Sequence, residues 1–211
     1  MAYYPVFLEV RERRCIVCGG GNVALRKVEA LLRAEALVTV IAPEVCPELA
    51  QMADDRMIAV TQREYREGDL EGAFVVVAAT DDREANRGIA ADARKHNCLV
   101  NAVDDAGCSD FIVPAAVNRG PLTIAVSTGG RSPALARKLR TLLETRFGED
   151  FGELVTLIGD VRAELKHCQR RVDEETWQRA LDLDALAAEL REQGPEAARK
   201  RLISNLTEGD L

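Results

Sequence analysis

Apolar and polar positions in the first half of the chain follow a repeating pattern of short apolar runs and amphipathic stretches. Residues 14–18 form an apolar run, and residues 22–36 place apolar side chains at helical spacing, which predicts a strand followed by a helix. Residues 74–79 are apolar at every position, as in a strand buried on both faces of a parallel sheet. The other predicted strands cover residues 37–41, 58–61 and 98–103, and the other predicted helices cover 47–53 and 82–95. Strands alternating with helices predict an α/β fold with a Rossmann-like, doubly wound parallel sheet.

The pattern changes after residue 112. Apolar runs at 112–117 and 122–127 flank the turn sequence Asn118-Arg119-Gly120-Pro121, which predicts a hairpin. Ser132 and Pro133 are typical of a helix start, and Gly148 is typical of its end. Three further helices are predicted over residues 150–169, 173–193 and 195–206. We therefore expect a Rossmann domain over 1–112, a small α+β segment over 113–148 and a helical domain over 149–211.

A glycine-rich turn joins the first predicted strand to the first helix. Gly19-Gly20-Gly21-Asn22-Val23-Ala24 fits the pattern G-x-G-x-x-G/A in the strand–turn–helix context that dinucleotide binding requires. In this interpretation Gly19 permits the tight turn, Gly21 lets the backbone approach the pyrophosphate, and Ala24 allows close packing of helix and strand. The N–H groups of Asn22 and Val23 would face the phosphates. The alternative is a glycine-rich turn that only reverses the chain.

Other residues at the same sheet edge indicate which cofactor binds. After the second strand the sequence is Ile41-Ala42-Pro43-Glu44, without the acidic residue that usually follows directly and without an arginine for a 2′-phosphate. This favours NAD over NADP, with backbone contacts from Ala42 and Pro43 to the adenosine. Thr80 and Asp81 follow the fourth strand and are expected to border the cofactor, or alternatively to cap the next helix.

Composition and charge exclude several classes of protein. The 211 residues are 47% hydrophobic and carry a net charge of −7, which disfavours binding to nucleic acid or to an anionic membrane. The longest apolar run is too short to span a bilayer, and the N-terminus lacks a signal-peptide pattern, so we expect a cytoplasmic protein. Six scattered cysteines favour reduced thiols. Cys15 and Cys18 lie three apart in a strand, on opposite faces, so we expect two core residues and no metal site.

Several segments together resemble the precorrin-2 dehydrogenase and sirohydrochlorin ferrochelatase family, which includes the N-terminal half of multifunctional siroheme synthases. The resemblance covers most of the chain, although the tail after Gly148 matches mainly in being helical. The segments that carry it are Tyr4-Pro5-Val6-Phe7, the glycine turn with Arg26-Lys27, Ala78-Ala79-Thr80-Asp81-Asp82, Asn101-Ala102-Val103-Asp104, Phe111-Ile112-Val113-Pro114-Ala115, and Ala125-Val126-Ser127-Thr128-Gly129-Gly130-Arg131-Ser132-Pro133-Ala134.

The resemblance implies an NAD-dependent enzyme that oxidises precorrin-2 to sirohydrochlorin. It implies that the middle segment, 113–148, is a dimerisation segment that forms a homodimer, and that ferrous iron is a co-substrate where the family member is also a chelatase. No protein-held metal is needed for that step, because the tetrapyrrole nitrogens are the final ligands. Asp104 falls at the position of the family's essential aspartate, where a carboxylate base beside the nicotinamide could take a proton. Asp105 follows directly, so which carboxylate faces the site stays open, and a pair of solvated turn residues is the alternative.

The segment from Ser127 to Pro133 is the candidate substrate-binding loop. It joins a strand to a helix, so the amides of Ser127, Gly129 and Gly130 could receive substrate carboxylates, with Arg131 as a charged partner. Capping of the helix by Ser132 is compatible with that role. A rival hypothesis from another class is a non-catalytic, NAD-sensing Rossmann module that regulates an oligomer. That hypothesis explains the glycine turn but neither this loop nor the helical tail.

Overall fold

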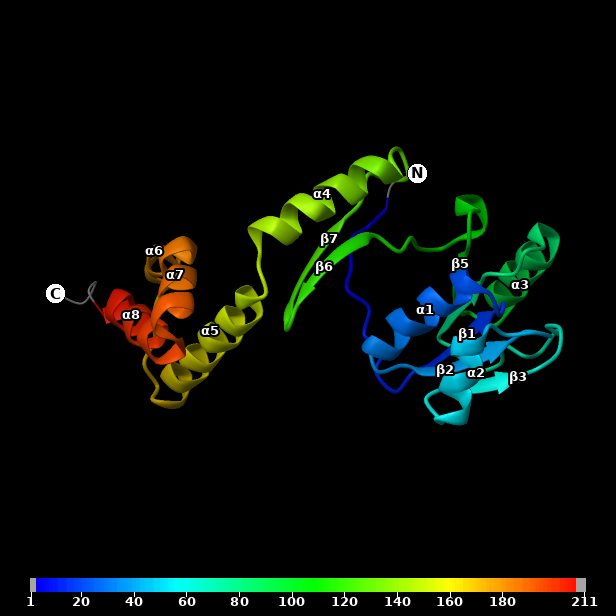
Figure 1. Cartoon of the computed structure of the whole chain (residues 1–211), viewed down its shortest axis with the longest axis horizontal. Coiled ribbons are helices and arrows are strands. Elements are labelled where there is room, and N and C mark those ends of the chain that lie inside the picture. The colour runs from blue at the N-terminus through cyan, green and yellow to red at the C-terminus, as the bar shows by residue number, and fades with distance from the viewer. Residues whose placement is uncertain (1–2, 208–211) are drawn as a thin grey trace. The chain divides into compact units, whose positions relative to one another are not determined.

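The computed structural model describes residues 3–207 (Figure 1). The chain forms two compact units, one up to Val113 and the other from Pro114 onward. The first boundary lies one residue beyond the predicted end of the Rossmann domain. The predicted division of the remainder into a dimerisation segment and a helical domain stays a prediction.

The first unit is a five-stranded parallel sheet with helices on both faces (Figure 1). The strand order is β3-β2-β1-β4-β5. The chain builds the sheet from β1 toward β3 on one side and from β4 toward β5 on the other, so the order switches between β1 and β4. In such sheets, the carboxyl ends of the two strands at this switch point border a ligand crevice. The strands are β1 Arg14–Cys18, β2 Leu37–Ile41, β3 Ala59–Thr61, β4 Val75–Ala78 and β5 Leu99–Ala102; the helices are α1 Asn22–Arg33, α2 Pro47–Asp54, α3 Arg83–Lys95 and the short 3₁₀ helix η1 Ala106–Cys108.

Separate hydrophobic clusters cover the two faces of this sheet. Helices α1 and α2 pack on one face through Val28 and Leu49, and α3 packs on the other through Ile89. Cys15 belongs to the first cluster and Cys18 to the second, which confirms that the two thiols point to opposite faces and lie in the core. All four residues of β4 are buried, as its uniformly apolar sequence predicts.

The second unit begins with an antiparallel hairpin and continues with helices. The hairpin strands are β6 Ala115–Arg119 and β7 Leu122–Val126, and the helices are α4 Pro133–Arg146, α5 Asp150–His167, α6 Glu174–Ala180, α7 Leu183–Gln193 and α8 Pro195–Thr207. Ser132 caps α4 by accepting a hydrogen bond from the Leu135 N–H at 3.2 Å, as the sequence predicts. A hydrophobic cluster that includes Leu154, Leu186 and Leu202 joins α5, α7 and α8.

The prediction of one helix over residues 173–193 is wrong. The segment forms α6 and α7, separated at Leu181 and Asp182. The Asp182 carboxylate accepts a hydrogen bond from the Ala185 N–H at 3.1 Å, so Asp182 is the N-cap of a new helix. The apolar spacing is compatible with a continuous helix, but aspartate at this position stabilises a helix start instead. In the part of the chain that the structure describes, no helix is long and apolar enough to cross a membrane.

Candidate nucleotide-binding site

A pocket of about 930 Å³ lies at the carboxyl ends of β1, β2 and β4, where the topology predicts a ligand crevice. The β1–α1 glycine turn and the residues after β2 and β4 form much of its wall. The residues that line the pocket are Gly19, Gly20, Gly21, Ile41, Ala42, Pro43, Glu44, Val45, Cys46, Glu64, Tyr65, Ala79, Thr80, Asp81, Asp82, Ala85, Gly88 and Ile89.

The three glycines of the turn differ in what surrounds them. Gly19 has a φ of +130°, and a Cβ there would lie 2.3 Å from the Ala79 carbonyl oxygen. A Cβ on Gly20 would lie only 1.9 Å from the Glu44 carbonyl oxygen, whereas a Cβ on Gly21 would meet no atom within 4 Å. Gly19 and Gly20 therefore allow close backbone packing, and Gly21 leaves space at the pocket. The sequence motif indicates the first and third positions but gives no signal for Gly20.

Six of the eight predicted cofactor-binding residues line the pocket: Gly19, Gly21, Ala42, Pro43, Thr80 and Asp81. Asn22 and Val23 are not in its wall; they are the first residues of α1, and Val23 packs partly against the hydrophobic cluster on that face. Gly21 is the N-cap of this helix and lines the pocket, so the start of α1 lies at its edge. Contact between the N–H groups of Asn22 and Val23 and a phosphate stays a prediction.

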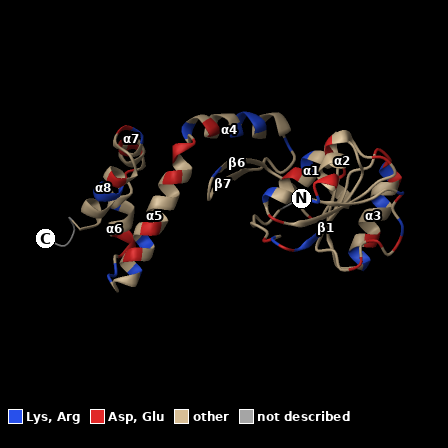
Figure 2. Cartoon of the chain, turned by 60° about the horizontal axis from the view of Figure 1, so that its bottom comes forward, with Lys and Arg blue, Asp and Glu red and all other residues tan. Residues whose placement is uncertain are grey.

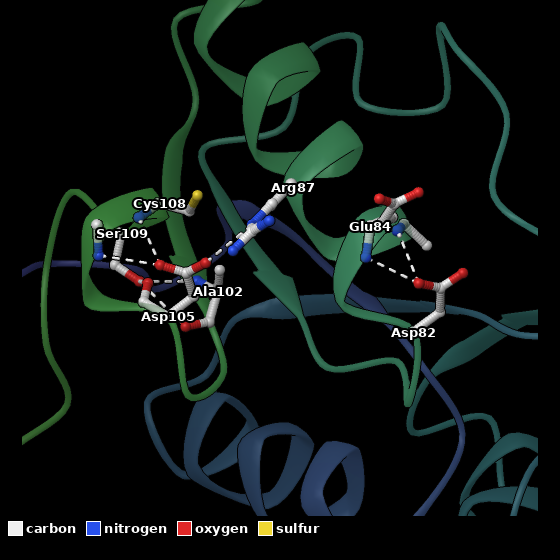
Figure 3. Close-up of polar contacts among 9 residues, drawn as sticks. Asp82, Glu84, Arg87, Ala102, Asp105, Cys108 and Ser109 are labelled. Atoms are coloured by element: carbon white, nitrogen blue, oxygen red, sulfur yellow. Dashed lines mark hydrogen bonds and ion pairs between the residues drawn. The ribbon is translucent and has the colours of Figure 1, made fainter.

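Thr80 and Asp81 line the pocket, but neither caps α3. Asp82 is the N-cap, and its carboxylate accepts hydrogen bonds from the N–H groups of Glu84 and Ala85 at 2.7 and 3.3 Å (Figure 3). Buried Asn86 holds Thr80, because its side-chain amide donates to the Thr80 carbonyl oxygen at 2.9 Å and its oxygen accepts from the Thr80 N–H at 3.1 Å. Asn86 thus fixes the loop after β4. Sequence reasoning missed it, because a polar residue within a helix is usually exposed.

The charged side chains that line the pocket are Glu44, Glu64, Asp81 and Asp82, and no lysine or arginine of the described residues joins them. An anionic group in this pocket therefore has backbone N–H groups, rather than a cationic side chain, as its available donors. The start of α1 supplies such N–H groups, and the dipole of that helix favours negative charge there.

One wall of the pocket includes Tyr65, which is held by a buried carboxylate. The Tyr65 hydroxyl donates a hydrogen bond to Asp92 of α3, and Asp92 is only 5% exposed. This hydrogen bond holds the pKa of Asp92 below its usual range. Burial, together with the carboxylate, raises the pKa of Tyr65. The ring is consequently fixed against α3.

The structure distinguishes between the two adjacent carboxylates after β5. Asp105 caps η1 by accepting from the N–H groups of Gly107 and Cys108 at 3.1 and 3.2 Å, and it forms a 3.3 Å ion pair with Arg87 (Figure 3). The hydrogen bond from Arg87 holds the pKa of Asp105 below its usual range. Asp104 is exposed and, within residues 3–207, has no hydrogen bond or ion pair. Asp105 therefore has a structural role, and Asp104 is available to a ligand.

A lysine lies near Asp104. The Lys27 ammonium on α1 donates a 3.4 Å hydrogen bond to the side chain of Asn101 on β5. Asn101 is buried, and its amide donates to the Phe111 carbonyl oxygen at 3.0 Å, which fixes its orientation. Burial lowers the pKa of Lys27, as does the charge of Arg26, whereas the negative charge of Asp104 opposes both effects. Sequence reasoning did not identify Lys27 or Asn101 as site residues in their own right.

The candidate substrate-binding loop of the second unit uses some of its own amides in hydrogen bonds within the loop. The Gly129 N–H donates to the Ser127 hydroxyl at 3.1 Å, and the Arg131 N–H donates to the Thr128 carbonyl oxygen at 3.1 Å. Gly129 and Gly130 have positive φ angles of 61° and 80°. Of the three amides expected to receive carboxylates, that of Gly129 is already used within the loop, and carboxylate binding by the other two stays a prediction. Of the predicted groups, the Ser127 and Gly130 N–H groups and the Arg131 guanidinium have no partner in the described part of the chain.

The described residues contain no group of three or more histidine, cysteine or acidic side chains that could hold a metal ion. The six cysteines are free thiols. Burial raises the pKa of Cys18 to about 12, so this thiol stays protonated at neutral pH.

Comparison with known proteins identifies similarities over both units. Residues 6–115 match the family model described as putative NAD(P)-binding, and residues 119–146 match the model described as the central part of sirohaem biosynthesis proteins. A siroheme synthase of Methylococcus capsulatus is 41% identical over 96% of this chain and 43% of its own length. A siroheme synthase of Nitrosospira multiformis is 38% identical over 99% of this chain and 46% of its own length. The chain thus spans less than half of these relatives.

A solved structure of SirC, a precorrin-2 dehydrogenase, is similar over 98% of this chain and all of its own, with a TM-score of 0.71 and 24% identity. This likeness shows that the two proteins share a fold. The predicted fold class, a Rossmann-like parallel sheet followed by a helical part, is confirmed.

Proposed function

Because the chain belongs to the putative NAD(P)-binding family matched by residues 6–115, and continues into the central part of sirohaem biosynthesis proteins, we propose that it is an NAD-dependent precorrin-2 dehydrogenase. The observation that carries this proposal is the placement of a nucleotide pocket and an unpaired carboxylate, Asp104, at the same edge of one parallel sheet. The similar siroheme synthases and the shared fold with a precorrin-2 dehydrogenase support the choice of reaction. A purely regulatory NAD-sensing module has no comparable support.

The pocket fits NAD better than NADP. Its charged wall is acidic, with Glu44 and Glu64 on the side of β2 and β3, and none of the described residues that line it is basic. A 2′-phosphate would add negative charge beside these carboxylates without a cationic partner, whereas a ribose hydroxyl can donate to a carboxylate. The glycine turn and the start of α1 would hold the pyrophosphate, and Ala42 and Pro43 would contact the adenosine.

Asp104 is the proposed catalytic residue. When bound, NAD supplies a hydride acceptor, and oxidation of precorrin-2 then requires the loss of one proton as well. An ionised Asp104 carboxylate can accept that proton, because its oxygens make no hydrogen bond to the described part of the chain. Lys27, held by Asn101, places a positive charge near this carboxylate. Asp105 stays bound to Arg87 and keeps the loop in place.

The substrate carboxylates would bind partly at the loop that contains Ser127, Gly129, Gly130 and Arg131. Arg131 is exposed, and arginine pairs with carboxylates through two parallel hydrogen bonds. The two left-handed glycines, the bond between Ser127 and Gly129, and the capped start of α4 give this loop a defined shape. Because the loop is preformed, little conformational entropy is lost when it binds an anion.

The second unit has an apolar surface that is suited to a homodimer. Leu135, Leu139 and Leu142 of α4 are 50%, 37% and 55% exposed, and they lie along one side of that helix. The β6–β7 hairpin packs against α4 within the unit, so it lies beside this surface. Pairing of two copies through α4 and the hairpin would cover this surface. We include the homodimer in the proposed function, together with a cytoplasmic location and ferrous iron as a second substrate.

The experiment that tests this function mixes the purified chain with precorrin-2 and NAD under anaerobic conditions. We expect NADH absorbance to rise together with the absorbance of sirohydrochlorin, in equal amounts. With NADP in place of NAD, the rate should fall by at least tenfold. Failure to form either product with a folded, NAD-binding protein would reject the proposed activity. Addition of ferrous iron to the sirohydrochlorin formed then tests chelation separately.

A further inference from the structure

One part of the nucleotide pocket is formed without the glycine turn. Helix α3 contributes Ala85, Gly88 and Ile89 to this part of the wall, and the loop after β3 contributes Tyr65. Although α3 carries several basic and acidic side chains (Figure 2), the three residues that it contributes to the pocket are small or apolar. None of these four residues belongs to the G-x-G-x-x-G/A motif, and the proposed function gives none of them a role.

Gly88 is unusual because it lies in the interior of a helix. A glycine at such a position destabilises the helix relative to alanine, since its backbone loses more conformational freedom on folding. A Cβ on Gly88 would meet no atom of a neighbouring residue within 4 Å, so the packing of the described residues does not require the missing side chain. Because Gly88 lines the pocket, the open space beside it is available to a ligand that approaches the helix backbone.

The Tyr65 ring is attached to the same side of α3. Its hydroxyl donates a hydrogen bond to buried Asp92, which follows Gly88 by four residues and therefore shares its side of the helix. The half-buried ring also packs on the hydrophobic cluster that contains Ile41 and Ile89, and both of these residues line the pocket. An aromatic ring and an open stretch of helix backbone thus belong to the same part of the pocket wall.

Several contacts hold the loop that carries Tyr65 in place. The Arg63 guanidinium donates two side-chain hydrogen bonds of 2.7 Å to the Asp69 carboxylate, which closes the loop on itself. Lys95 of α3 donates to Glu67 of the loop at 2.9 Å, so the loop is tied to the helix at a second point. Because the ring is held in this way before a ligand binds, little conformational entropy is lost when a ligand packs against it.

We propose that Tyr65 and Gly88 recognise the flat base of the bound dinucleotide, with Asp92 as a positioning residue that holds the Tyr65 ring. The base packs against this ring, as nucleic-acid bases pack on aromatic side chains, and against the helix backbone at Gly88. The two residues thus determine which nucleotide the pocket accepts. The identification of the base as the adenine of NAD rests on the proposed function, whereas the preference for a flat aromatic group rests only on the pocket.

Substitution of Gly88 tests this role, because stability and binding should change in opposite directions. Gly88→Ala should raise the melting temperature by about 3 °C, since alanine stabilises a helix interior. The same variant should weaken binding of ADP-ribose by about tenfold in calorimetric titrations, because the methyl group occupies space that the base needs. Its affinity for nicotinamide mononucleotide, which lacks the adenine base, should stay at the wild-type value.

Gly159→Ala is the matched control. Gly159 also lies inside a helix, α5, and a Cβ there would likewise meet no neighbouring atom within 4 Å, but Gly159 is remote in sequence from the pocket and does not line it. This variant should raise the melting temperature without changing the affinity for ADP-ribose.

The contact with Tyr65 can be observed directly by NMR. The chain has three tyrosines, so Tyr3→Phe/Tyr4→Phe leaves Tyr65 as the only one. With this variant we expect intermolecular nuclear Overhauser effects between the Tyr65 ring and the adenine protons of ADP-ribose. Tyr65→Leu should weaken binding by about tenfold, within the range for loss of one base–aromatic contact. Asp92→Ala should weaken it by about threefold, and Asp92→Asn, which keeps an acceptor for the hydroxyl, should restore it.

The proposal is wrong if Gly88→Ala keeps wild-type affinity for ADP-ribose, if it weakens nicotinamide mononucleotide equally, or if the Tyr65 ring shows no Overhauser effect to the base. Circular dichroism confirms that each variant is folded. ADP-ribose accepts no hydride, so these titrations do not depend on turnover. The expected pattern without precorrin-2 oxidation would therefore reject the proposed function and keep this inference, and oxidation with wild-type affinity in Gly88→Ala would do the reverse.

Discussion

At the scale of single residues, the three glycines of the β1–α1 turn have different physical reasons to lack a side chain. Gly20 faces the Glu44 carbonyl oxygen and Gly21 faces open space at the pocket. We expect Gly20→Ala to destabilise the first unit by about 2 kcal/mol, because the backbone has to move to admit a Cβ. Gly21→Ala should leave stability nearly unchanged but weaken NAD binding by at least tenfold, because its methyl group occupies space at the turn.

Thermal unfolding and NAD titration of the two glycine variants check this pair of expectations. Wild-type stability in Gly20→Ala, or wild-type NAD affinity in Gly21→Ala, would contradict the assigned roles.

The Tyr65–Asp92 pair gives a prediction about pH. Asp92 has a lowered pKa, so its contribution to stability is present above about pH 4 and is lost as the pH falls through its folded-state pKa. Tyr65 has a raised pKa, so its contribution is present below about pH 10 and is lost as the pH rises above that value. Tyr65→Phe removes the hydrogen bond and should destabilise the first unit by about 2 kcal/mol at neutral pH.

The same variant should also show a smaller loss of stability at both pH extremes than the wild type does. Melting temperatures measured across the pH range test this, and Tyr4→Phe, an exposed tyrosine, is the matched control. An unchanged pH profile in Tyr65→Phe would show that the pair does not stabilise the fold.

The sequence predicts some site residues and not others for a clear physical reason. Gly19 and Gly21 belong to a local motif, so their places can be inferred from neighbours in the chain, whereas Asp104 is indicated by the resemblance to a known family. The need for a glycine at position 20 comes from the Glu44 carbonyl oxygen, 24 positions later. The position of the Lys27 side chain depends on its hydrogen bond to Asn101, 74 positions away. Contacts at such separations exist only after the sheet has assembled, and no local pattern encodes them.

At the scale of elements, the parallel strands follow the sequence closely, because they are mostly apolar and end at turns. The break between α6 and α7 was not predicted, because Asp182 stands in a stretch whose apolar spacing continues across it. A single capping hydrogen bond, to the Ala185 N–H, favours a new helix start there. The hydrogen bonds within the loop from Ser127 to Ser132 could not be predicted from the sequence either. Which hydroxyl and amide groups bond to each other within a turn depends on the φ and ψ angles of that turn.

The role of Asp182 can be measured directly. Asp182→Ala should lower the free energy of unfolding of the second unit by about 1 kcal/mol, because the Ala185 N–H loses its acceptor. Glu192→Ala, near the other end of α7, is the control and should change stability little. Chemical denaturation followed by circular dichroism gives both values. Equal stability of the Asp182 variant and the wild type would mean that the cap does not determine the helix boundary.

At the scale of the whole molecule, the proposed dimer depends on the exposed leucines of α4. We expect the chain to sediment as a dimer, and Leu135→Glu/Leu142→Glu to sediment as a monomer, because the charges would be buried in the interface. Leu183→Glu alters another exposed leucine, at the start of α7, and should leave the dimer intact. Sedimentation equilibrium distinguishes these cases, and a monomeric wild-type chain would contradict the proposal.

At this scale, the nucleotide pocket and Asp104 are proposed to act in one oxidation reaction, and comparison of two adjacent carboxylates tests this proposal most directly. Single-turnover oxidation of precorrin-2 should be measured with the NAD-loaded wild type, Asp104→Asn and Asp105→Asn. We expect Asp104→Asn to bind NAD normally and to lose at least a hundredfold in rate, the range for removal of a general base. Asp105→Asn should keep most of the rate. Undiminished oxidation by Asp104→Asn would contradict the proposed role of Asp104.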